Sequence, residues 1–88
     1  MHEINRREHT AMTVTYRTNL IDDMRAAAIR CARYWAKDST PQTISACKRA
    51  VEISIYYQDR CTLDSPDWHW HDAFIAELGD WLMLHTAS

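Results

Sequence analysis

Residues 39–60 read STPQTISACKRAVEISIYYQDR, and this run predicts a helix with a defined start. The Thr40 hydroxyl can cap the first turn, and Pro41 suits the first helical position, where a backbone N–H would have no partner. The apolar residues that follow recur at a helical period, which predicts a helix over residues 41–60. They cover a wide arc, as expected for a helix with a neighbour on each side.

The same start signal recurs further along the chain, where Ser65 precedes Pro66. It predicts a helix over residues 66–85. Upstream, apolar residues at helical spacing predict another helix over residues 19–37. Only short links separate the three segments, and short links make consecutive helices antiparallel neighbours.

The N-terminal residues follow a different pattern. Residues 1–10 are polar and charged, whereas apolar and polar residues alternate across residues 12–17 with frequent β-branching, which is typical of a strand. We therefore expect residues 1–17 to form a flexible or extended arm, either packed irregularly or paired with a strand of another molecule. The predicted fold is all-α, a small three-helix antiparallel bundle over residues 18–88 behind an extended N-terminal arm.

Composition supports this fold class and a cytoplasmic protein. The chain has 88 residues, 47% of them hydrophobic, which suffices for one globular domain. One glycine and two prolines are too few for the tight turns of an all-β fold. Three cysteines without regular spacing indicate free thiols in a reducing cytosol, and no apolar run is long enough to predict a membrane span.

Charge is distributed unevenly along the chain. The formal net charge is only −2, yet all ten Lys and Arg residues lie at or before Arg60. The remainder of the chain carries five acidic residues and no basic one. An acidic segment of this kind can accelerate association with a basic partner surface. It is equally consistent with an ordinary solvated helix face.

Large aromatic residues exceed what one small core is expected to cover, since the chain has four Trp and four Tyr. Trp and Tyr dominate interface hot spots. The leading hypothesis is therefore a non-catalytic protein-interaction module, an inhibitor or modulator of the immunity, phage or plasmid type, that binds a larger protein with a basic surface. A homo-oligomer is a further alternative. The candidate partner-binding residues are Trp70, Asp72, Phe74, Glu77, Asp80 and Trp81.

A second hypothesis is a small DNA-binding transcriptional regulator. Residues 39–45 resemble the turn and the start of the recognition helix in helix-turn-helix proteins, and two basic residues follow. The resemblance covers about ten residues and departs from that motif at Tyr34 and Asp38. It implies DNA contacts from the segment 41–60. The residues concerned would be Gln42, Thr43, Ser45, Lys48 and Arg49.

The histidine-rich run around Trp70 does not predict a metal centre. His69 and His71 are two residues apart, so on a helix they point to different sides, and no set of four ligands has the spacing of a zinc site. We expect His71 to bond Asp67 at the edge of the core and His69 to be solvated. The sequence predicts no cofactor, no metal and no catalytic residue.

Two cysteines provide a test of the helix register. Cys31 and Cys47 are equally far from Ser39, the middle of the first link. If the two flanking helices pack as an antiparallel pair, these thiols should face each other across them.

Overall fold

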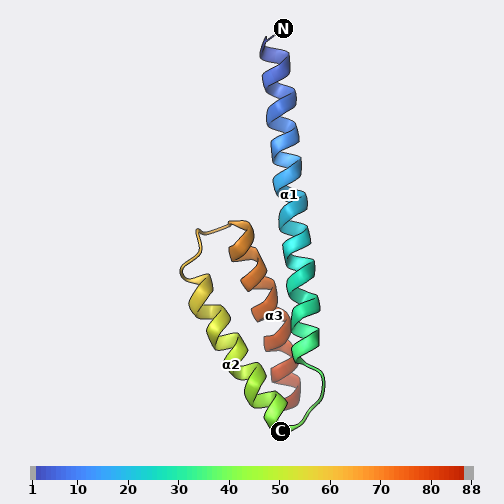
Figure 1. Cartoon of the computed structure of the whole chain (residues 1–88), viewed down its shortest axis with the longest axis vertical. Helices are drawn as coiled ribbons and strands as arrows, with labels where there is room; N and C mark the ends of the chain where they lie inside the picture. The colour runs from blue at the N-terminus through green and yellow to red at the C-terminus, as the bar shows by residue number, and fades with distance from the viewer. Residues whose placement is uncertain (1, 87–88) are drawn as a thin grey trace.

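The computed structural model describes the backbone of residues 2–86 and the side chains of residues 16–86. It contains three helices: α1 (His2–Trp35), α2 (Pro41–Gln58) and α3 (Pro66–Thr86). Figure 1 shows α1 and α3 side by side and running in the same direction, with α2 antiparallel to both. The predicted all-α three-helix bundle is therefore confirmed.

The N-terminal half of α1 departs from the sequence-based expectation. Residues 12–17 were predicted to be extended, and this is wrong, because α1 continues through them as one helix of 34 residues. β-branched residues cost a helix only tenths of a kcal/mol each. Extending a helix that is already anchored also requires no new nucleation. This half projects past α2 and α3 (Figure 1), and the molecule is 64 Å long as a result.

The predicted helix starts at Thr40 and Ser65 are confirmed. Thr40 Oγ1 accepts a hydrogen bond from the Thr43 backbone N–H at 3.2 Å. Ser65 Oγ accepts one from the backbone N–H of Trp68, also at 3.2 Å. In the α1–α2 link, hydrogen bonds from the side chains of Thr43 and Thr40 lower the pKa of Asp38 to about 2. Both turns are thus fixed by local hydrogen bonds.

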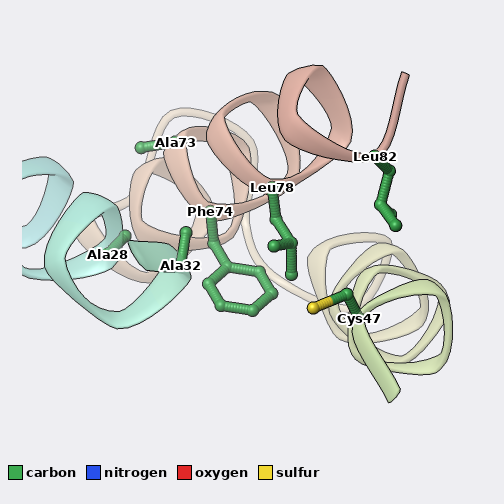
Figure 2. Packing of buried hydrophobic residues seen from close by; sticks show 7 residues of the cluster. All are labelled: Ala28, Ala32, Cys47, Ala73, Phe74, Leu78 and Leu82. Carbon is green, nitrogen blue, oxygen red and sulfur yellow. The ribbon is translucent and has the colours of Figure 1, made fainter. Parts of the chain in front are cut away.

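The hydrophobic core is centred on α3. Phe74 and Leu78 of α3 point into the space between Ala32 of α1 and Cys47 of α2 (Figure 2). Leu78 and Cys47 are fully buried. The other core residues are small or lie at the ends of the cluster, namely Ala28, Ala73 and Leu82.

The pairing of helices is uneven. α3 packs along both other helices, whereas α1 and α2 make few contacts with each other. The expectation that consecutive helices would be close neighbours is therefore met by α2 and α3 but not along most of α1 and α2. The reason is that α3 inserts its two largest core side chains between them. Cys31 and Cys47 are both free thiols, and their cross-linking remains a prediction.

Candidate protein-binding groove

α2 buries small and polar side chains most completely, and its apolar Ile44, Ala50 and Val51 pack half-buried against the core. Its buried residues are Thr43, Cys47 and Ser54. Other large apolar residues of α2 are exposed: Ile53 is 46% exposed and Tyr57 is 53% exposed. Each of these side chains would contribute about 1.5–3 kcal/mol if it were fully buried.

These exposed residues line a groove between α1 and α2, which we call the α1–α2 groove. Its volume is about 500 Å³. Residues of α1 and α2 form its walls, and residues of α3 lie at its base. The lining residues are Cys31 and Trp35 of α1; Ala46, Arg49, Ala50, Ile53, Ser54 and Tyr57 of α2; and Trp70, His71 and Phe74 of α3.

The α2 wall carries a regular stripe. Ala46, Ala50, Ile53 and Tyr57 all line the groove and follow one another at intervals of four, three and four residues. This is the spacing with which one helix packs against another in a coiled coil. A signal for this surface was therefore present in the sequence, where it could not be distinguished from a second core-facing stripe.

The groove continues at both ends. At the α2–α3 link it joins a hollow of about 460 Å³ that Arg60, Cys61 and Asp67 line. At the α1–α2 turn it joins a hollow of about 260 Å³ that Tyr34 and Lys37 line. The open surface thus extends over nearly the whole length of α2.

A hydrogen-bonded pair lies in the base of the groove. Ser54 Oγ and His71 Nδ1 are 2.7 Å apart, so the bond predicted from His71 to Asp67 is replaced by one to α2. Burial lowers the pKa of His71, and the nearby Asp67 carboxylate opposes this effect. Ser54 is only 4% exposed, and its hydroxyl is engaged in this bond. The pair satisfies two polar groups between α2 and α3.

The predicted aromatic residues occupy different environments. Trp70 and Phe74 stack at 5.1 Å between ring centroids, but Phe74 is only 3% exposed and belongs to the core. Trp70 is half-buried and lines the groove. Trp81 stacks on His85 near the end of α3, away from the groove. The structure therefore joins two of the three, Trp70 and Phe74, to the candidate site.

Two of the predicted acidic residues face α1. Arg25 donates to Asp72 Oδ2 at 3.0 Å, and Arg33 Nε donates to Glu77 Oε1 at 3.2 Å. These ion pairs offset the two negative charges locally. Asp80 is exposed and lies beside two exposed apolar residues, Met83 and Leu84.

A third ion pair joins Arg17 of α1 to Asp64, in the link that precedes α3. Arg17 donates to the backbone carbonyl of Asp64 at 2.9 Å and lies 3.4 Å from its carboxylate. Asp64 has a φ of 66°, a conformation that Asp tolerates better than most residues. Its other carboxylate oxygen bonds His69, which lowers the pKa of Asp64. The prediction that His69 is solvated is wrong, since its side chain is 18% exposed and also contacts Arg25.

The residues proposed to contact DNA all lie on α2, but not all of them are exposed. Gln42, Ser45, Lys48 and Arg49 are exposed. Thr43 is only 7% exposed and helps to cap α2. α1 and α2 run antiparallel (Figure 1), whereas the helices of a helix-turn-helix motif cross at about 90–120°. The local resemblance in sequence therefore does not extend to the geometry.

The described residues contain neither a cluster of metal-ligating side chains nor a membrane-spanning helix. Within that part of the chain, no three His, Cys, Asp or Glu side chains are placed to share a metal ion. None of the described helices combines the length and the apolar content needed to cross a bilayer.

Comparison with known proteins adds no further assignment. The chain matches no protein-family model, no curated protein and no solved structure.

Proposed function

We propose that this chain is a non-catalytic protein-interaction module that binds a helix of another protein in the α1–α2 groove. The observation that carries the proposal is the orientation of α2. It buries Thr43, Cys47 and Ser54 and leaves Ile53 and Tyr57 exposed along a helix-packing stripe. An exposed apolar surface of this kind typically marks an interaction site.

The chemistry of the groove favours a helical occupant. Its two walls are helices, whose backbone hydrogen-bonding groups are used internally, so an extended strand would find no edge to pair with. A helix laid against the stripe of α2 would bury Ile53, Tyr57 and Trp35 by packing side chains between side chains. It would convert the three-helix bundle into a four-helix bundle.

A second copy of this chain fits the groove less well than another protein does. In a two-fold dimer the same surface meets itself. The cations Lys37, Arg49 and Arg60 of the two copies would then be brought together around an apolar centre. Like charges brought together in an interface oppose binding.

By binding a helix of its partner and so covering it, such a module would act as an inhibitor or modulator of that partner. The three free thiols suit the reducing cytoplasm, which we propose as its location.

A designed peptide tests the proposal directly. The probe is an amphipathic helix of about 18 residues, matched to the length of α2, with a Leu stripe, Gln at its margins and no Trp. Because Trp35 and Trp70 line the groove, binding should change their fluorescence emission in a saturable way. Ile53→Asp should weaken binding at least about tenfold, since it places a charge in the apolar contact.

The matched control is Leu84→Asp, which makes the same kind of change at an exposed apolar residue outside the groove. It should leave the affinity unchanged, and circular dichroism should show both variants folded. Absence of binding, or binding that Ile53→Asp leaves intact, would contradict the proposal. So would a dimer in sedimentation equilibrium that Ile53→Asp dissociates, because the groove would then be covered by a second copy.

A further inference from the structure

Three cationic side chains lie along the α1–α2 groove, one for each of its parts. Lys37 lines the hollow at the α1–α2 turn, Arg49 lines the centre, and Arg60 lines the hollow at the α2–α3 link. The one carboxylate that lines these three spaces is Asp67. The groove and its two hollows are therefore lined by more cationic than acidic side chains.

These cations differ from those of the α1–α3 interface. Arg17, Arg25 and Arg33 each form an ion pair with an acidic residue of α3 or of the link before it. Among the described side chains, the three groove cations form no ion pair. Acidic residues lie close in sequence, but the carboxylate next to Lys37, that of Asp38, accepts hydrogen bonds from the backbone N–H and the hydroxyl of Thr40.

Arg60 shows that one of these charges is held in place. Its guanidinium carbon lies 3.6 Å from the centroid of the Tyr56 ring, and its Nη1 donates to the Tyr56 carbonyl at 3.4 Å. Stacking on an aromatic face leaves the charge available to a carboxylate at the edge of the guanidinium group. The side chain is thus positioned before any partner binds.

We infer that the partner helix bound in the α1–α2 groove carries carboxylate side chains beside its apolar face, opposite Arg49 and near the two ends of the groove. This inference rests on the proposed function and specifies its partner. Glu or Asp residues flanking the apolar stripe would meet Arg49 and Arg60 on the α2 side and Lys37 at the turn. The apolar side chains would meanwhile cover Ile53, Tyr57 and Trp70. The partner is therefore an acidic amphipathic helix.

Three peptides with one common Leu stripe test the inference, with margins of Glu, Gln or Lys. We expect the Glu peptide to bind about fivefold to tenfold more tightly than the Gln peptide, since each exposed ion pair strengthens binding only modestly. The Lys peptide should bind more weakly than the Gln peptide. These differences should shrink as salt is raised to about 1 M.

Charge removal then locates the effect. The triple variant Lys37→Gln, Arg49→Gln and Arg60→Gln should bind the Glu and Gln peptides within about twofold of each other. The matched control is Arg30→Gln combined with Lys48→Gln, which removes exposed cations that do not line the groove. It should retain most of the preference.

The outcomes separate this inference from the proposed function. If the Glu and Gln peptides bind equally and Ile53→Asp abolishes both, the groove binds helices but the acidic partner is wrong. Tighter binding of the Lys peptide would overturn the inference in the same way. If none of the peptides binds, both proposals fail. A preference for Glu that survives the triple variant would show that other residues select the charge.

Discussion

The two sides of α1 differ in how completely they are covered. Towards α3, α1 presents the small residues Ala28 and Ala32, which allow the two helices to pack closely around Phe74. Three Arg residues of α1 bind acidic groups along the edge of the same interface. Towards α2, Trp35 remains 40% exposed beside an open groove.

The difference shows that amphipathic patterning does not by itself state which apolar stripe is covered. α2 has two apolar stripes, and the one that packs against the core contains Ile44, Cys47 and Val51. Close helix packing favours small residues and matched polar margins, both of which the α1–α3 and α2–α3 contacts have. The stripe with Ile53 and Tyr57 is left exposed.

The largest contrast is expected between a core residue and a groove residue. Leu78→Ala should lower the free energy of unfolding by about 2–5 kcal/mol, because Leu78 is fully buried and its loss leaves a cavity. Ile53→Ala should cost about 0.5 kcal/mol or less, as expected for an exposed position. Urea denaturation of both variants measures the difference. Equal losses would mean that the groove is closed in solution and that the comparison does not hold.

A smaller effect is expected at Ser54, on the boundary between core and groove. Ser54→Ala removes the partner of His71 and should cost about 1 kcal/mol, near the low end for a buried hydrogen bond because the ring is only half-buried. Urea denaturation at neutral pH measures this loss. A neutral Ser54→Ala substitution would show that water replaces the hydroxyl and that the groove is wet at its base.

His71 of this pair should make the free energy of unfolding depend on pH. Burial holds the pKa of His71 below its usual 6.5, so the folded state favours the neutral ring. The contribution of the neutral ring to the free energy of unfolding is fully present above about pH 6.5 and is lost as the pH falls through the lower pKa of the folded state. In His71→Gln, unfolding free energies measured from about pH 7.5 to about pH 5.5 should fall less than in the unsubstituted chain.

The smallest effect concerns the edge of the covered interface. The pair formed by Arg25 and Asp72 is partly exposed, so its coupling energy should be about 0.2–1 kcal/mol. A double-mutant cycle with Arg25→Gln and Asp72→Asn measures this energy and removes other effects of each substitution. The coupling should diminish in about 1 M salt. A coupling energy of zero would mean that this ion pair does not stabilise the α1–α3 interface and that apolar contacts do so instead.

Local signals account for what could be predicted. The caps at Thr40 and Ser65 act within one helical turn, so the starts of α2 and α3 follow from neighbouring residues. The alternation over residues 12–17 is also local, but it is a weak preference, and the anchored helix overrides it. The Ser54–His71 bond joins two helices and had no local signal.

The ion pairs of the α1–α3 interface illustrate the same limit. Arg17 and Arg25 bind Asp64 and Asp72, each 47 residues further along the chain. This equal spacing is visible in the sequence, yet it has meaning only if α1 and α3 are parallel neighbours. The sequence pattern predicted an acidic, solvated face on α3, whereas the structure turns Asp72 and Glu77 towards α1.

The sequence by itself determined the helical class, the two turns and the starts of α2 and α3, because capping and periodicity depend on residues close together in the chain. Only the tertiary structure decided which stripe of α2 is buried, which charges are paired and where the groove opens. These depend on the mutual packing of three helices, and the decisive choice is that α3, rather than α1, covers α2.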